Sequence, residues 1–199
     1  MTPGIRVLTG HDGQRFTFDP GSLCLDLLAT GGPGEYRRWE ALHEPADLAG
    51  WLTGSALARP APLDPADIAL RPADLGRVRE LRDTLWPVVQ RLARGEGVLD
   101  PAAVALVNDA AAAAPCPRLD PATGQRRWVT PLTGAQVLGA VARDAIDVLA
   151  RTDGRLRECA GGNCELLFLD TSRPGSRRWC SMERCGNRNK VRGYRTRHA

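Results

Sequence analysis

Apolar residues recur at helical spacing through most of the first 150 residues of the chain. The longest stripe runs over residues 72–94, where leucine and valine return every three or four positions and so share one helix face. Pro72 suits the first position of this helix and Gly95 its stop, while Pro87 in the interior predicts a kink. Similar patterns predict further helices at residues 22–31, 45–59, 99–114 and 133–154.

Strand signals are short and few. Residues 15–19 alternate apolar and polar side chains, and residues 118–119 and 126–129 flank a turn-forming Asp-Pro-Ala-Thr-Gly segment, which predicts a hairpin. The glycine run at 31–34 has no Lys-Ser/Thr after it, so we interpret it as a connector and not as a phosphate-binding loop. Residues 1–152 therefore predict a mostly helical α+β domain with short hairpins.

Four of the six cysteines fall in the last 41 residues as two close pairs. They are Cys159, Cys164, Cys180 and Cys185, with about fifteen residues between the pairs. Thiolates at this spacing are typical of a tetrahedral zinc site, and a segment of about 40 residues seldom holds together without such a staple. Four protein ligands leave no open position on the metal, so one zinc ion with a structural role is predicted.

Two other uses of these cysteines, disulfide bonds and an iron–sulfur cluster, are less favoured by the sequence but stay open at this point. Disulfide pairing is unusual in a reducing compartment, and an iron–sulfur cluster does not fit because the basic sequence between the pairs lacks ferredoxin spacing. Cys24 and Cys116 lie far away in apolar or turn contexts, and we interpret them as unrelated to the metal.

The sequence around the four cysteines predicts a small fold of its own over residues 153–199. Residues 166–169 and 177–180 have strand character and flank a turn at 171–175, while the run from Cys185 to His198 predicts a helix. A knuckle, a hairpin and a helix in this order indicate a treble-clef-like zinc finger. The predicted fold class is thus α+β, with a helical N-terminal domain followed by this finger.

Charge is distributed unevenly over an otherwise ordinary globular composition of 43% hydrophobic and 25% charged residues. Residues 151–199 carry 12 Lys+Arg and 5 Asp+Glu, a net of +7, and the other residues carry 15 and 18, a net of −3. A zinc ion with four thiolates contributes −2, so about +5 remains in the C-terminal quarter. An acidic body with a basic C-terminal segment points to a nucleic-acid partner.

Basic residues gather on the predicted final helix. Four recur at the spacing of one helix face: Arg184, Arg188, Arg192 and Arg195. The neighbouring face, which we expect to pack back on the hairpin, carries Asn187, Val191, Tyr194 and His198. The candidate nucleic-acid contacts are Arg177, Arg178, Asn187, Arg188, Lys190, Arg192, Arg195 and Arg197. A charged face that is merely solvated stays an alternative.

Two strings resemble known families. Cys159-Ala-Gly-Gly-Asn-Cys164 together with Cys185-Gly-Asn-Arg188 resembles the CGNR zinc finger, which is named for the second of these strings. The segment Leu23–Thr30 resembles the opening of the ABATE domain, which precedes this finger in stress-induced transcription regulators. Ala29 stands where that opening usually has Asn.

The resemblance implies an α+β body, a treble-clef finger and a DNA-binding regulator. It further implies a body that senses a small-molecule effector, with a pocket near the N-terminal helix and Asp26. The leading interpretation is accordingly a DNA-binding transcription regulator. The alternative is a zinc-stabilised module that binds RNA or an acidic protein, although only Trp179 and Tyr194 are available to stack on single-stranded bases.

Other classes receive less support from the sequence. No G-x-S-x-G or H-E-x-x-H motif occurs, and the three histidines are scattered, so we expect no enzyme. The start lacks a cationic segment followed by an apolar one, and no window reaches the length of an apolar membrane span. We therefore expect a soluble cytoplasmic protein without a membrane partner.

Overall fold

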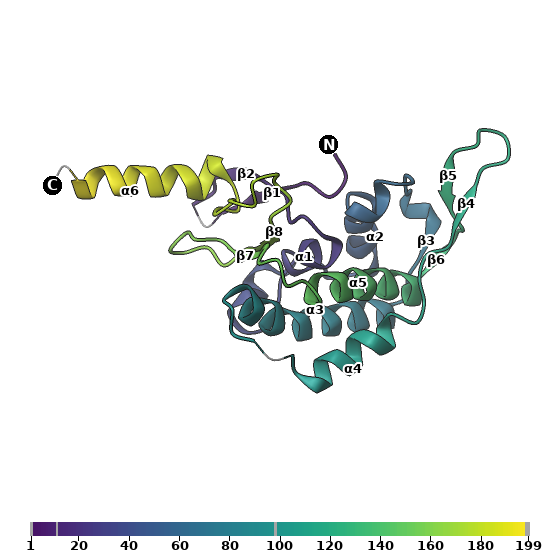
Figure 1. Ribbon diagram of the computed structural model, residues 1–199. Coiled ribbons are helices and arrows are strands. Elements are labelled where there is room, and N and C mark those ends of the chain that lie inside the picture. The colour runs from purple at the N-terminus through teal and green to yellow at the C-terminus, as the bar shows by residue number, and fades with distance from the viewer. Residues whose placement is uncertain (1, 11, 98, 198–199) are drawn as a thin grey trace.

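The computed structural model describes residues 2–10, 12–97 and 99–197, with side chains as far as Arg192 (Figure 1). The helices are α1 (Leu23–Leu28), α2 (Pro45–Thr53), α3 (Pro72–Ala93), α4 (Pro101–Ala110), α5 (Gly134–Leu149) and α6 (Asn187–Arg197). The strands are β1 (Arg6–Thr9), β2 (Arg15–Phe18), β3 (Ile68–Ala69), β4 (Pro117–Leu119), β5 (Arg126–Trp128), β6 (Leu132–Thr133), β7 (Leu156–Glu158) and β8 (Leu167–Leu169). Short turns of helix lie at η1 (Gly34–Trp39), η2 (Ala56–Ala58), η3 (Pro65–Asp67) and η4 (Met182–Gly186).

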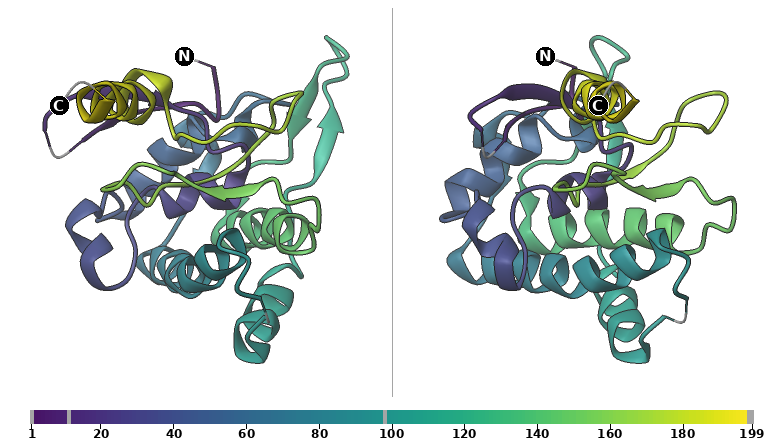
Figure 2. Two further views of the ribbon diagram at one scale, coloured as in Figure 1. Left: turned by 60° about the vertical axis from the view of Figure 1, so that its left-hand side comes forward. Right: turned by 90° about the vertical axis from the view of Figure 1, so that its left-hand side faces the viewer.

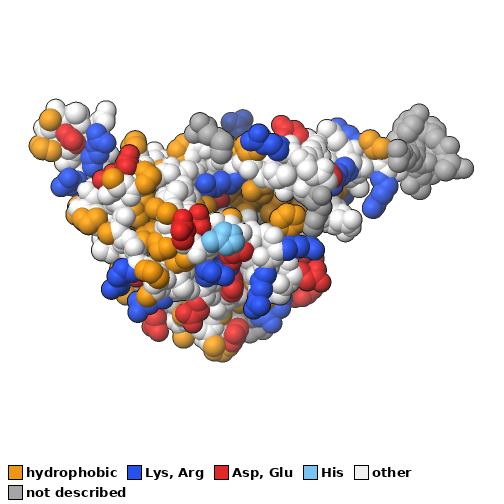
Figure 3. All heavy atoms as spheres, turned by 180° about the vertical axis from the view of Figure 1, so that it is seen from behind, with side chains coloured by type: hydrophobic (Ala, Val, Ile, Leu, Met, Phe, Trp, Pro, Cys, Tyr) orange, Lys and Arg blue, Asp and Glu red, His pale blue; other side chains and the backbone are white. Residues whose placement is uncertain are grey.

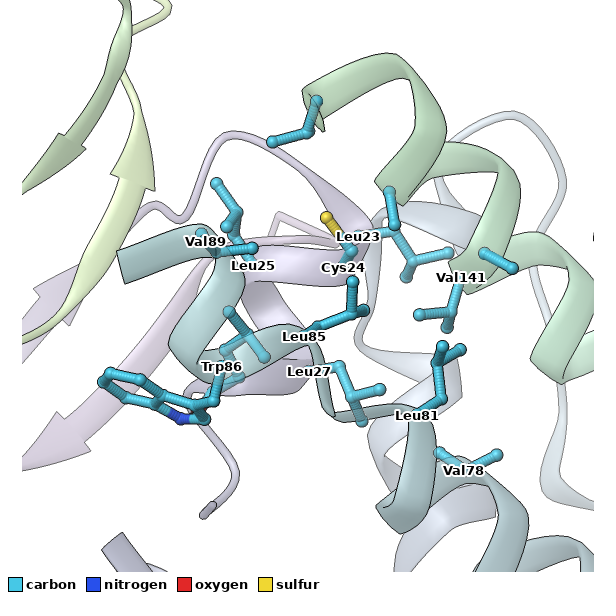
Figure 4. Packing of buried hydrophobic residues seen from close by; sticks show 14 of the residues in the cluster. Leu23, Cys24, Leu25, Leu27, Val78, Leu81, Leu85, Trp86, Val89 and Val141 are labelled. Atoms are coloured by element: carbon cyan, nitrogen blue, oxygen red, sulfur yellow. The ribbon is translucent and has the colours of Figure 1, made fainter. Parts of the chain in front are cut away.

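Helix α1 lies at the centre of the main hydrophobic core. All six of its residues are buried, and it packs against α3 and α5. The Ser22 hydroxyl caps the helix by accepting a hydrogen bond from the Leu25 backbone N–H at 3.3 Å. Figure 4 shows its side chains among those of the two longer helices: Leu23, Leu25 and Leu27 lie near Val78, Leu81, Leu85 and Val141. A helix this short is stable because its surroundings bury it on every side.

The predicted helices are present, with differences at their ends. Helix α3 continues past Pro87 to Ala93 and is followed by Gly95, whose φ of +76° lies in the left-handed region that ends helices. The capping box predicted for α5 is formed by Thr133 and Gln136. The predicted ends near residues 114 and 154 are wrong, since α4 ends at Ala110 and α5 at Leu149. Pro115 disfavours helical geometry at the residue before it, which limits α4.

The strands form four separate two-stranded sheets. Strand β2 confirms the predicted strand near residues 15–19, and its antiparallel partner β1 was not predicted. Strands β4 and β5 confirm the predicted hairpin, which projects from the body in Figures 1 and 2. Strands β3 and β6 pair in parallel beside the start of α5.

The predicted hairpin between residues 166–169 and 177–180 is wrong. Strand β8 pairs instead with β7, which lies on the other side of the first cysteine pair. Residues 177–180 are not a strand, because the buried carboxylate of Asp170 accepts the Arg177 backbone N–H at 2.7 Å and folds the intervening segment into a loop. The two-strand unit of the C-terminal region is therefore the β7–β8 pair, and we name the loop that it closes, residues 159–166, the knuckle.

The C-terminal region packs on the rest of the protein through two hydrophobic clusters. Leu167 and Leu169 of β8 belong to the main core around α1. The four cysteines share a second cluster, here named the zinc cluster, with Phe16 and Phe18 of β2 and Phe168 of β8. Helix α6 extends away from the body, as Figures 1 and 2 show.

Candidate metal centre and nucleic-acid interface

The first cysteine pair lies on the knuckle between β7 and β8. The Cys159 N–H donates to the Leu166 carbonyl at 2.9 Å, and the Cys164 N–H donates to the Gly161 carbonyl at 3.0 Å, which closes a tight turn. A Cβ atom at Gly161 would lie 2.9 Å from the Cys185 sulfur. Glycine at this position therefore lets the knuckle approach the second cysteine pair.

The second pair is brought to the knuckle by backbone hydrogen bonds. The Ala160 N–H donates to the Arg178 carbonyl at 2.9 Å, and the Cys180 N–H donates to the Cys159 sulfur at 3.2 Å. Ser181 then caps η4, a π-helical turn that carries Cys185 and continues directly into α6. The metal site and the basic helix are thus parts of one continuous segment.

The Arg177 side chain points inward. Its guanidinium donates to the carbonyls of Trp179, Cys180 and Asp19 at 2.7–3.0 Å and lies 4.0 Å from the centre of the Phe168 ring. Arg177 was predicted as a nucleic-acid contact, but these bonds tie residues 177–180 to the end of β2. Arg178 is exposed and lies over Trp179.

The four sulfurs match the geometry of a single tetrahedral zinc ion. All four lie within 4.8 Å of one another, and Cys180 is 3.6 Å from both Cys164 and Cys185. Zinc–sulfur bonds of about 2.3 Å at tetrahedral angles give sulfur–sulfur distances of about 3.8 Å. These cysteines therefore hold one zinc ion, as predicted. A zinc ion held by these four cysteines would cross-link the knuckle to η4.

Hydrogen bonds among the four sulfurs set their protonation in the absence of a metal ion. Hydrogen bonds from the Cys164 and Cys180 thiols lower the pKa of Cys159 to about 2. The hydrogen bond with Cys159 raises the pKa of Cys164 to about 12, and bonds to Cys159 and Cys164 raise the pKa of Cys180 far above its usual range. Without a metal ion the cluster thus keeps protons at neutral pH, and a divalent cation must displace them.

The apparent zinc affinity is expected to fall as the pH is lowered. Zinc binding releases more than one thiol proton from this cluster, so the affinity should drop by more than tenfold per pH unit near neutrality. Competition with a chromophoric chelator at pH 8, 7 and 6 measures this dependence. An affinity that changes by less than tenfold over the whole range would contradict proton displacement from these sulfurs.

Arg184 does not share the face predicted for it. Its side chain is 5% exposed and lies 4.7 Å from the centre of the Phe16 ring. The reason is that Arg184 belongs to the π-helical turn η4, in which α-helical spacing does not apply. The strand pair β1–β2 holds this turn, because the Glu183 carboxylate accepts the Thr17 N–H at 3.2 Å. This contribution of β1–β2 to the site was not predicted.

The first part of α6 presents its side chains to solvent. Asn187, Arg188, Asn189, Lys190, Val191 and Arg192 are all exposed. The prediction that Asn187 and Val191 pack back on the hairpin is therefore wrong, and Val191 is 52% exposed. Arg188 forms an ion pair with Asp12. The side chains of Arg195, Arg197, Tyr194 and His198 lie outside the described part of the structure.

A small pocket separates the knuckle from α6, and we name it the knuckle pocket. Its volume is about 150 Å³. Arg188 and Arg192, one helical turn apart, line it together with Gly161, Gly162, Asn163, Cys164, Cys185 and Asn189. A Cβ atom at Gly162 would lie 3.4 Å from an Arg192 guanidinium nitrogen, so this part of the knuckle lies close to the Arg192 side chain. Figure 3 shows blue basic side chains around the base of α6.

Asp26, near which an effector pocket was expected, lines neither the knuckle pocket nor the larger pocket beside the end of α1. Its buried carboxylate accepts two hydrogen bonds from the Arg6 guanidinium, at 2.8 and 2.7 Å. Arg6 also donates to the Trp51 carbonyl, so the pair connects β1 to α1 and α2. The carboxylate of Asp26 is thus engaged in a structural contact.

The fold and the cysteine site define a zinc-finger protein with an α+β N-terminal domain. Residues 21–152 match the ABATE family, described as "Putative stress-induced transcription regulator", and residues 155–198 match the CGNR zinc finger. The chain belongs to this regulator family and carries its zinc finger, as its resemblance predicted. The comparison with curated proteins gave no match. Within the described ranges, no helix has the length and hydropathy needed to cross a membrane.

Proposed function

We propose that the protein regulates transcription by binding DNA through the exposed start of α6, while its N-terminal domain senses a small-molecule effector. The role is one of binding, without a catalytic step. The observation that carries the DNA-binding part is the convergence of Arg188 and Arg192 on the knuckle pocket. Two guanidinium groups one turn apart on an exposed helix can take successive phosphate oxygens.

The surroundings of these two arginines favour an anionic partner. Asn163 and Asn189 add amide groups to the pocket. Lys190, which follows Asn189 in the sequence, is exposed. Residues 173–199 contain nine Lys and Arg side chains against one acidic residue, Glu183. The −2 charge of the zinc–thiolate centre offsets only part of this excess. A basic surface of this kind binds the DNA backbone with a strong salt dependence.

Replacing Asp12 by asparagine is expected to strengthen DNA binding. Asp12 pairs with Arg188 at the surface, with side chains 39% and 48% exposed, so a phosphate can replace it at small cost. The Asp12→Asn variant should bind duplex DNA several-fold more tightly in a fluorescence anisotropy titration. The control is Asp109→Asn, an exposed position on α4 that should leave the affinity unchanged. A weaker Asp12→Asn complex would contradict the placement of DNA at Arg188.

Binding assays at matched salt test the proposed partner. The intact zinc-loaded protein is titrated with duplex DNA, single-stranded RNA and an acidic peptide, and a genome-wide pull-down identifies preferred DNA sites. Tightest binding to duplex DNA supports the proposal. Tighter binding to RNA or to the peptide, with no enriched DNA site, would favour an interaction module instead. Trp179 is partly buried in the zinc cluster, which leaves it poorly placed to stack on single-stranded bases.

A further inference from the structure

A larger cavity of about 280 Å³ lies where the N-terminal domain meets the C-terminal region, and we name it the junction cavity. Its size is close to the lower end of small-molecule sites. Strands β1 and β2, the end of α1, η1, α3, the knuckle and η4 all contribute to its lining. Figure 3 shows orange hydrophobic side chains in a recess below α6, on the side where these elements meet.

Aromatic rings form one wall of the junction cavity. Tyr36 stacks on Trp86 with ring centres 3.8 Å apart and an angle of 18° between the planes, and Trp39 also lines the cavity. The Trp86 indole N–H donates to the carbonyls of Leu28 and Gly31, which fixes its ring. This wall is therefore held in place before any ligand arrives and offers flat apolar surface.

The lining also includes an arginine with one hydrogen-bond donor that is not used. Arg184 is 5% exposed, and its buried Nε has no hydrogen-bond partner. None of the ion pairs between described residues includes it. The Phe16 ring lies against one side of the guanidinium, and a Cβ atom at Gly10 would lie 2.5 Å from its Nη2.

A buried guanidinium with an unpaired N–H is costly unless an anion satisfies it. The nearby zinc–thiolate centre would carry −2, but its sulfurs accept no hydrogen bond from the buried Nε of Arg184. Of the other charged groups in the lining, Arg38 adds a positive charge and Glu165 a negative one. The Glu165 carboxylate already accepts the Tyr36 hydroxyl at 2.5 Å. Among the side chains that line the cavity, Arg38, Glu165 and Arg184 therefore sum to +1, and the buried Nε of Arg184 still lacks an acceptor.

We propose that the junction cavity binds a small aromatic monocarboxylate. Its carboxylate accepts hydrogen bonds from Arg184, and its ring packs between Trp39 and the Tyr36–Trp86 stack. A second carboxylate on the ligand would face Glu165 and is disfavoured. This inference rests on the effector-sensing part of the proposed function and gives that part a site and a ligand class. Because Arg184 directly precedes the zinc ligand Cys185, the occupied cavity contacts the segment that leads into α6.

Direct binding without DNA tests this site. Isothermal titration of the full-length zinc-loaded protein with 2-naphthoate should show one site per chain, and the uncharged 2-naphthamide should bind at least tenfold more weakly. Arg184→Met keeps the apolar stem and should weaken naphthoate binding by about 10- to 100-fold, the value of a charged hydrogen bond. Arg178→Met is the matched control, since Arg178 is exposed in the same region and does not line the cavity.

A second variant keeps the test valid if Arg184→Met does not fold. Ala29→Leu places a larger side chain in the cavity lining and leaves Arg184 intact. This variant should also weaken naphthoate binding, because the larger side chain occupies space in the cavity. Its zinc content reports whether the metal site is formed. If neither 2-naphthoate nor the smaller phenylacetate binds, the proposal is overturned. Equal binding of acid and amide, or unaltered naphthoate binding in both variants, overturns it as well. None of these outcomes depends on whether the protein binds DNA.

Discussion

Cys180→Ser is expected to lose zinc and the ordered structure of the C-terminal region. Cys180 is 2% exposed, its sulfur contacts those of Cys164 and Cys185, and its N–H donates to Cys159. Zinc contributes about 10–16 kcal/mol of apparent free energy to modules of this kind. Losing one of four ligands should therefore separate the knuckle from η4. Elemental analysis should find little zinc, and DNA binding should disappear.

The same variant should loosen β1–β2 as well. Phe16 and Phe18 lie in the zinc cluster, so disorder around the cysteines exposes the buried face of this strand pair. In hydrogen exchange, the amides of β1 and β2 should lose protection, while those of α3 and α5 in the separate main core should keep it. Cys116→Ser is the control, since Cys116 is exposed and does not belong to the cluster of four cysteines. One zinc per chain in Cys180→Ser would contradict the four-cysteine site.

Arg82→Met is expected to lower the free energy of unfolding by about 3–5 kcal/mol, because it leaves a largely buried carboxylate without its main partner. Arg82 is 1% exposed and donates to both oxygens of Glu40, at 2.8 and 2.7 Å. It also donates to the Thr30 hydroxyl and to Asp83. These bonds connect α3 to residues 29–41, the segment that follows α1. Several residues of this segment line the junction cavity.

Arg79→Met is the matched control, since Arg79 pairs with the same Glu40 carboxylate but is 43% exposed. Its loss should cost at most about 1 kcal/mol. Urea unfolding at neutral pH compares the two variants, and equal losses would contradict the role of burial. Burial raises the pKa of Glu40, but the hydrogen bonds from Arg82 outweigh it and hold the pKa below its usual range. The contribution of this pair is therefore present above about pH 4.3 and is lost as the pH falls through the lowered pKa.

Local chemistry explains what the sequence could predict. The metal ligands were identifiable because two close cysteine pairs have few other uses in a reducing compartment. The capping box of Thr133 and the proline at the start of α3 mark helix starts through contacts within a few residues. Strand β8 was recognisable from its apolar run, but its partner was not, because pairing depends on how the Asp170 loop folds.

Contacts between distant residues were beyond the sequence pattern. Arg82 looks like an ordinary charged position on a helix, yet it is buried because Glu40 and Thr30 reach it from another segment. Arg184 was grouped with Arg188 because an α-helix was assumed, whereas the π-helical turn and Phe16 bury it. The junction cavity likewise depends on segments that are separated by more than 100 residues, such as β1 and the knuckle.

The salt dependence of DNA binding tests the central claim most directly. The measurement compares the slope of log affinity against log salt for the wild type and for Arg188→Ala/Arg192→Ala, with duplex DNA. Each phosphate contact contributes about 0.9 to this slope, so the double variant should lose about 1.8. Arg118→Ala/Arg127→Ala removes the same charge from the β4–β5 hairpin and serves as the control.

If DNA lies at the start of α6, the slope falls in the Arg188→Ala/Arg192→Ala variant alone. Its zinc content and melting temperature should stay unchanged, because both side chains are exposed. An unaltered slope and affinity in this variant, with zinc still bound, would contradict the account and place any DNA contact elsewhere on the protein.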